Sequence, residues 1–396
     1  MKPKIYLTLL SLLCAFTTIV LIYFTISSLP KADEAYGYLR SFKQSNEIWP
    51  ALDMSPYWTI SSIYLWIISG FHRLINIFFG TDVIISGRIF SIICWLLTLR
   101  IVLLEEKSVQ WKLLVLIFNP LLLVFATRAH PLVPAILLIY VYWKMLGNKR
   151  IAGAGLLLTL AVNFQVYTGG IAAMLFAMWD KNFFKKGLQD FAIIAAFAVA
   201  GVVLTWITWG GLYPQQFLSH GFYRENHLNG TPSFGYLASI LLLPGGYFFI
   251  IGDRPYLQLA RVSAYNLIVV VLILICCFFL YFTKEIVGVT SLAINQIFGP
   301  SGKVIWIAIY GIAGLGWLRV HRDHFFLLFG LLGAGVLLVL LPYFYERITI
   351  FASIAPCLGW CLKSTQNEGT THQVRSLVFC SLFVVLAVIY EFYGSL

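Results

Sequence analysis

Charged residues are scarce in this chain of 396 residues, where 27 Lys and Arg and 16 Asp and Glu make up only 11% of the sequence. Soluble domains carry about a quarter charged residues, because a water-facing surface needs them. Hydrophobic residues make up 60% of the chain, and many of them come in blocks of about 20 residues, the length of a membrane-spanning helix. These observations exclude a soluble fold and predict an all-α polytopic membrane protein.

The sequence also lacks the features of a disulfide protein or a nucleic-acid binder. The cysteines all lie in apolar stretches, where thiols behave as small hydrophobic groups. They are Cys14, Cys94, Cys276, Cys277, Cys357, Cys361 and Cys380. The net charge is +11, but the positive residues are scattered over short loops instead of being massed on one face. We therefore interpret them as topology signals and as contacts for anionic membrane lipids.

The apolar blocks predict about thirteen transmembrane helices. They cover residues 5–28, 83–104, 111–127, 131–146, 151–166, 167–179, 191–209, 234–251, 262–282, 304–318, 325–341, 348–362 and 377–390. Several are shorter than the roughly 20 residues of a perpendicular span, so we expect tilt or local thinning of the bilayer. The hydrophilic stretches between them are short. The chain is therefore expected to form one transmembrane domain, residues 1–396, with no separate soluble domain.

Residues 57–79 decide the topology, because counting them as a span reverses the orientation of everything that follows. Their polar residues fall on one helical stripe, as expected for a helix that lies flat in the interface. The stripe comprises Thr59, Ser62, Trp66, Ser69, Arg73 and Asn76. With this segment flat, the majority of the Lys and Arg residues lie on the cytoplasmic side, as short cytoplasmic loops require. We therefore expect residues 29–82 to form an outer loop with interfacial helices, the alternative being a span with a polar inner face.

Two carboxylates, Asp33 and Glu34, directly follow the first predicted span. At the boundary of water and lipid, partial burial and nearby positive charges can hold a carboxylate ready as a base. The alternative is a helix cap or a solvated acid. Carboxylates are essentially missing from the middle of the predicted spans. This weakens the hypothesis of an ion-coupled transporter, which needs ionisable groups near the midplane and usually has broken helices arranged in repeats.

Several motifs in order along the chain resemble the GT-C superfamily of lipid-dependent glycosyltransferases. They are the acidic pair Asp33-Glu34, then Ser55-Pro56-Tyr57, Gly87-Arg88, residues 127–131 (Thr-Arg-Ala-His-Pro) and residues 347–356, which begin with Arg and end with Pro. The likeness is to the branch with protein O-mannosyltransferases and aminoarabinose transferases. Two features depart from that branch: His130 stands where many relatives carry Asp, and no large outer domain follows the last span.

The resemblance implies transfer of a sugar from a polyprenyl phosphate, undecaprenyl or dolichyl, to a hydroxyl of a lipid, glycan or protein acceptor. Asp33 is expected to act as the base and Glu34 to orient it, with inversion at the anomeric carbon. The residues expected to bind phosphate or substrate are Arg128, His130, Arg347, Arg88 and Tyr345. No cofactor follows from the motifs, and the involvement of a divalent cation stays open. The site is expected on the non-cytoplasmic face of a prokaryotic plasma membrane, or of the endoplasmic reticulum in a eukaryote.

A second outer loop, residues 211–233, is dense in polar groups. It contains His220, Arg224, Glu225 and His227, which predict either a lid over acceptor or sugar or a solvated connector. Two further functions remain open for the chain as a whole. One is an enzyme like the O-antigen polymerases and ligases, in which the acidic pair is incidental. The other is a carrier or flippase for lipid-linked sugars.

Overall fold

A computed structural model describes residues 3–27, 62–164, 188–209, 235–252, 263–282, 286–287, 294–295, 297–319, 331, 344–363 and 370–393. The helices are α1 (Pro3–Ser27), α3 (Ser62–Phe79), α4 (Val83–Leu103), α5 (Lys107–Ile117), α6 (Pro120–Ala126), α7 (Leu132–Gly147), α8 (Ile151–Phe164), α11 (Leu188–Trp209), α14 (Gly235–Ile251), α15 (Ala264–Phe282), α17 (Gly302–Gly314), α19 (Glu346–Lys363) and α20 (Thr370–Tyr393). Two 3₁₀ helices, η4 (Gly299–Ser301) and η5 (Leu315–Arg319), flank α17. Strands β1 (Ile286–Val287) and β2 (Phe344–Tyr345) pair in parallel.

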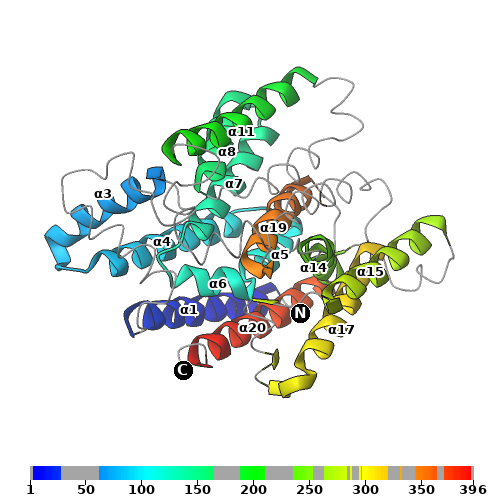
Figure 1. Ribbon diagram of the computed structural model, residues 1–396. Helices are drawn as coiled ribbons and strands as arrows, with labels where there is room; N and C mark the ends of the chain where they lie inside the picture. The colour runs from blue at the N-terminus through cyan, green and yellow to red at the C-terminus, as the bar shows by residue number, and fades with distance from the viewer. Residues whose placement is uncertain are drawn as a thin grey trace.

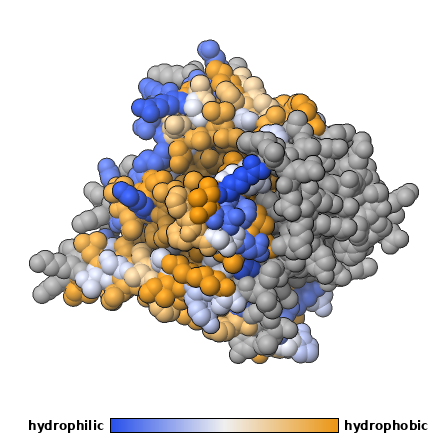
Figure 2. Space-filling model, turned by 90° about the vertical axis from the view of Figure 1, so that its left-hand side faces the viewer, coloured by the Kyte–Doolittle hydropathy of each residue, from blue (hydrophilic) through white to orange (hydrophobic). Residues whose placement is uncertain are grey.

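The described part of the chain contains six helices that are long and apolar enough to cross a membrane, or seven if the bent pair α5–α6 is one span. Helices α7, α8 and α14 are apolar but shorter, as the lengths of their sequence blocks predict. Hydrophobic side chains cover most of the described surface on the face shown in Figure 2. The chain is thus an α-helical membrane protein. Of the thirteen predicted blocks, residues 167–179 lie outside the described residues, as do residues 325–341 apart from Leu331.

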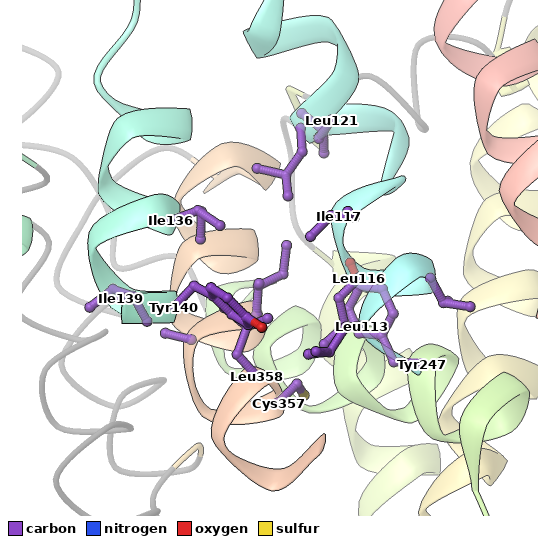
Figure 3. Packing of buried hydrophobic residues seen from close by; sticks show 14 of the residues in the cluster. Leu113, Leu116, Ile117, Leu121, Ile136, Ile139, Tyr140, Tyr247, Cys357 and Leu358 are labelled. Carbon is purple, nitrogen blue, oxygen red and sulfur yellow. The ribbon is translucent and has the colours of Figure 1, made fainter. Parts of the chain in front are cut away.

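The core is built from apolar side chains of helices that are far apart in the sequence. Figure 3 shows Leu113 and Leu116 of α5 near Tyr247 of α14 and Leu358 of α19, with Tyr140 of α7 beside them; all five are buried. Other helices surround this core: α8 and α11 pair beside α7, and α15 and α17 pack on α14 (Figure 1). Burial of these side chains is the main stabilising contribution between the helices inside the protein.

Helices α1 and α20 lie side by side, and their C-terminal ends meet (Figure 1). Phe24 and Phe392, each in the last turn of its helix, pack edge to face with ring centroids 5.3 Å apart. Arg88, in the second turn of α4, donates a hydrogen bond to the carbonyl oxygen of Thr25 at 3.0 Å. The end of α1, the end of α20 and the beginning of α4 therefore share one end of the bundle. We call it the Arg128 end, because the turn between α6 and α7 also lies there.

The predicted span at residues 111–127 is broken at Asn119 and Pro120, where α5 and α6 meet at 62°. The Asn119 side chain accepts hydrogen bonds from the backbone N–H groups of Leu121 and Leu122, at 2.8 and 3.4 Å, and donates to the Tyr247 hydroxyl. The indole of Trp95 donates to the carbonyl of Ile117 at 3.1 Å. Backbone groups exposed by a break inside a membrane must find such partners. The break between α5 and α6 is therefore stabilised by specific hydrogen bonds and is part of the fold.

Helix α3 is not among the helices long enough to be counted as spans in the described residues, and it packs mainly on the beginning of α4. Its Phe71 packs on Phe90 with ring centroids 5.3 Å apart, and His72 Nδ1 lies 3.0 Å from the Ser86 hydroxyl. Burial lowers the pKa of His72 below its usual value, so the imidazole is neutral at pH 7. Near its start, α3 packs Tyr64 against Phe164 at the end of α8.

Gly87 allows the close contact between α4 and the turn between α6 and α7. A Cβ added at Gly87 would stand 2.7 Å from the Cβ of Ala129. We expect Gly87→Ala to destabilise the protein by about 1–3 kcal/mol through overpacking, measured by denaturant unfolding of the purified protein in detergent. The double variant Gly87→Ala with Ala129→Gly should regain most of the loss. If the second change brought no recovery, the contact would not be the cause.

Candidate functional site

The turn between α6 and α7 is held rigidly by its own side chains. The Thr127 hydroxyl donates to the carbonyl of Val124 at 2.7 Å, and the backbone N–H of His130 donates to the carbonyl of Arg128 at 2.8 Å. Nδ1 of His130 accepts a hydrogen bond at 3.1 Å from the backbone N–H of Leu132, the first residue of α7. The neutral imidazole therefore carries its proton on Nε2. Nε2–H is therefore the donor group of the His130 ring.

Arg128 presents its guanidinium group between two aromatic rings and a carboxylate. Its central carbon lies 5.3 Å from the ring centroid of Phe125 and 5.7 Å from that of Tyr390. Nη2 lies 3.6 Å from Oε1 of Glu391. The two groups form an ion pair, but this separation is too long for a good hydrogen bond. The side chains of Arg128 and Glu391 are only 11% and 3% exposed. A charged pair this buried in a membrane protein indicates a functional site.

Glu391 was not predicted from the sequence, because the last apolar block was expected to end at Tyr390. Helix α20 continues to Tyr393 and so includes Glu391, the one acidic residue in this helix. Its Oε1 also lies 3.4 Å from the Thr127 hydroxyl. Glu391 and Thr127 line a small pocket between α1, α6 and α20, whose other walls are mainly apolar side chains. The signal in the sequence was a lone acid at the end of a long apolar helix.

Arg88 has a structural partner that the sequence did not reveal. It is buried, and its hydrogen bond to Thr25 reaches a carbonyl in the last turn of α1, where helix carbonyls lack intrahelical donors. A guanidinium there also complements the negative end of the helix dipole. The structure thus uses Arg88 to join α1 to α4. It lies at the same end as Arg128 and His130, since its neighbour Ser91 donates to the carbonyl of His130 at 3.4 Å.

Of the residues predicted for the site, the structure brings Arg88, Arg128 and His130 together at the Arg128 end. Tyr345 belongs to β2 and pairs with Val287, and Arg347 belongs to the first turn of α19; their side chains lie outside the described residues. So do Asp33 and Glu34, and the loop residues His220, Arg224, Glu225 and His227. Within the described ranges, no three His, Cys, Asp or Glu side chains are grouped so that they could hold a metal ion.

No protein-family model, no curated protein and no solved structure matches this chain. The observations therefore define a class, an α-helical membrane protein with a buried ion pair at one end of its bundle. The glycosyltransferase resemblance is carried by the motifs in the sequence alone.

The ion pair can be tested through stability. Replacing Glu391 by Gln leaves the Arg128 charge buried beside an uncharged side chain. We expect a loss of roughly 3 kcal/mol in the free energy of unfolding, because removing one partner of a buried pair is costly. The double variant Glu391→Gln with Arg128→Gln should regain part of this loss. Glu106→Gln, a control at an exposed carboxylate, should change the free energy by less than about 1 kcal/mol. Equal losses of stability in Glu391→Gln and Glu106→Gln would contradict the assignment of the ion pair.

Proposed function

We propose that this protein is a membrane glycosyltransferase that moves a sugar from a polyprenyl phosphate to an acceptor hydroxyl at the Arg128 end. The observation that supports this most directly is the position of Arg128. Its guanidinium group, held by a rigid turn between two rings, lies at the same end of the bundle as the last turn of α1. Asp33 follows Ser27, the last residue of α1, by six residues. Six residues of extended chain span at most about 20 Å.

The contact between Arg88 and Thr25 also supports a flat position for α3. Helices α1 and α4 are each long enough to cross a membrane. Because the end of α1 touches the beginning of α4, residues 28–82 leave and return at the same end of the bundle, and so cross the membrane an even number of times or not at all. A single crossing by α3 would break this rule, and residues 28–61 hold no apolar block of spanning length. We therefore place α3 along the leaflet, as its polar stripe predicts.

The reaction needs a base for the acceptor and cations for the leaving phosphate. In the proposed step, the acceptor oxygen forms a bond to the anomeric carbon while the bond from that carbon to the phosphate oxygen breaks. Asp33 takes the acceptor proton, and Glu34 orients it. The polyprenyl phosphate leaves with the bonding electron pair, so no general acid is obligatory. Direct displacement inverts the anomeric carbon, as in other single-step glycosyl transfers.

Arg128 is proposed to bind the phosphate, because its planar group matches two phosphate oxygens at once. Glu391 then has a defined role. It neutralises Arg128 while no donor is bound, since an unpaired guanidinium would be costly in this buried position. His130 Nε2–H, Arg347 and Tyr345 are proposed as further contacts to the donor. The loop at residues 211–233 is proposed to cover the acceptor.

This activity places the site on the non-cytoplasmic face, in the plasma membrane of a prokaryote or in the endoplasmic reticulum. The donor lipid would accordingly be an undecaprenyl or a dolichyl phosphate, and the acceptor a lipid, a glycan or a protein. Only a membrane enzyme reaches both the phosphate at the headgroup level and the tail in the lipid. The six long apolar helices of the described residues are compatible with a membrane location.

A lipid-linked sugar flippase is the second candidate, and one observation favours it. The span formed by α5 and α6 is broken at Asn119, and α14 beside it contains Pro244 within its length. Interrupted helices that meet in the core are typical of transporters. The break in this protein is filled by the Asn119 and Tyr247 side chains, which favours a structural role.

One experiment separates the two functions. The purified full chain is reconstituted in vesicles with polyprenyl phosphates that carry different radiolabelled sugars and with a mixed pool of membrane acceptors. An enzyme releases free polyprenyl phosphate and labels an acceptor at a rate proportional to protein. A flippase moves the intact labelled lipid between leaflets and leaves the bond from sugar to phosphate whole. Lipid movement without any bond cleavage would overturn the proposed function.

A further inference from the structure

A second polar cluster lies at the opposite end of the bundle from Arg128, where α5, the end of α19 and the beginning of α20 meet. Lys112 is fully buried, and its ammonium group lies 5.5 Å from the ring centroids of both Trp111 and Trp360. The Trp111 ring packs on the ring of His372, with centroids 5.1 Å apart. The Ser376 hydroxyl donates to the carbonyl of Trp111 at 2.9 Å, which fixes α20 against α5. We call this set, with Arg375, the Lys112 cluster.

The nitrogen-bearing side chains of the Lys112 cluster present hydrogen-bond donors. Arg375 Nη2 donates to Nδ1 of His372 at 2.6 Å, so the neutral imidazole carries its proton on Nε2. Lys112 and Arg375 have only N–H groups to offer, and so do the two indoles. An arrangement of positive charges and donors favours an anion, in particular one with several oxygen atoms.

One hydrogen-bond donor of the cluster is independent evidence for a ligand. The indole N–H of Trp111 is buried, with 1% of the residue exposed, and within the described ranges it has no hydrogen-bond partner. Buried polar groups are nearly always paired, so an exception needs an explanation such as a missing ligand. His372 and Arg375 are partly exposed and form the open side of the cluster, through which a ligand can approach.

We propose that the Lys112 cluster binds the phosphate group of an anionic phospholipid headgroup. Apart from Trp360, which lies in the last turn of α19, its residues lie in the first two turns of α20 and of α5, and the positive ends of helix dipoles attract phosphate. The loops at this end carry many of the Lys and Arg residues that mark the cytoplasmic side, where anionic lipids are enriched. Tryptophan is suited to this depth because its ring is apolar while its N–H is polar. The proposal is independent of the glycosyltransferase activity.

The test uses the purified full chain in a neutral detergent and measures its thermal unfolding while lipid is added. The additions are phosphatidylglycerol, phosphatidylcholine and, in a separate arm, inorganic phosphate at the same phosphate concentration. The variants are Trp111→Phe, which removes the N–H and keeps a ring, and Arg375→Gln. The matched control is Arg100→Gln, which removes an exposed cation of α4 at the same end but outside the cluster.

Phosphatidylglycerol is expected to raise the unfolding temperature of the wild-type protein and of Arg100→Gln by several degrees, and phosphatidylcholine by much less. The apparent dissociation constant should rise at least fivefold in Arg375→Gln and about two- to fivefold in Trp111→Phe. Trp111→Phe is expected to fold, because it keeps an aromatic ring and removes a donor that has no hydrogen-bond partner within the described residues. Equal shifts by both lipids, or equal affinities in all variants, would overturn the proposal. An equal shift by inorganic phosphate would assign the site to the free ion and overturn the lipid assignment.

Discussion

Replacing Asp33 by Asn is expected to slow sugar transfer by about 10²–10⁴-fold, the usual contribution of a positioned general base. The amide keeps the size of the side chain but cannot take the proton from the acceptor hydroxyl. Binding of the polyprenyl phosphate donor should change by less than about threefold, because the base acts on the acceptor and not on the phosphate. The loss should therefore appear in kcat, while the KM for the donor stays nearly constant.

The matched control for this change is Asp82→Asn. Asp82 is an exposed carboxylate that precedes α4, in the same outer loop of the predicted topology. It should leave transfer within about twofold of the wild-type rate. If Asp33→Asn were as active as Asp82→Asn, the acidic pair would have no part in the chemistry. An enzyme of the polymerase or ligase kind, which depends on arginines and a histidine, would then become the better explanation.

Replacing Arg128 by Gln is expected to lower kcat/KM for the lipid donor by about 10²–10³-fold, since it removes a charged donor from the leaving phosphate. Arg128→Lys should recover only part of this loss, because an ammonium group cannot bind two phosphate oxygens in the planar manner of a guanidinium. Direct binding of the donor should weaken as well. This pattern differs from that of Asp33→Asn, in which binding is retained.

Loss of folding must be separated from loss of phosphate binding, because Arg128→Gln leaves Glu391 buried without its partner. The double variant Arg128→Gln with Glu391→Gln removes both charges and should be more stable than Arg128→Gln alone. It should remain as inactive as Arg128→Gln. Recovery of transfer in the double variant would show that Arg128 supports the fold only, and would remove it from the proposed phosphate site.

The positions of the helices were largely predictable, because each depends on a local run of apolar residues. Helix α4 begins at Val83 as expected, and α7, α8 and α11 lie within a few residues of their blocks. The break between α5 and α6 was missed, although Asn119-Pro120 is a recognisable helix start with a cap and Pro at the first position. The surrounding residues are so apolar that one continuous span was expected.

The contacts of the site were much harder to predict. Arg128 and Glu391 are separated by more than 260 residues, and a single sequence contains no information about which distant residues meet. The same holds for Arg88, whose partner is a backbone carbonyl of α1. Every residue type has such a carbonyl, so the sequence does not reveal this contact. Gly87 was noticed as part of the Gly87-Arg88 motif. The physical reason for a glycine there, the close contact with Ala129, can be seen only once the helices are packed.

The most direct test of the account asks on which side of the membrane the segment before α4 lies. In a variant whose native cysteines are replaced, single substitutions Asp33→Cys, Asp82→Cys and Arg100→Cys are treated with a membrane-impermeant maleimide in sealed vesicles of known orientation. We predict that positions 33 and 82 react from the same side and position 100 from the other, because α3 lies flat and α4 crosses. Reaction of positions 33 and 82 from opposite sides would contradict the shared site of Asp33 and Arg128.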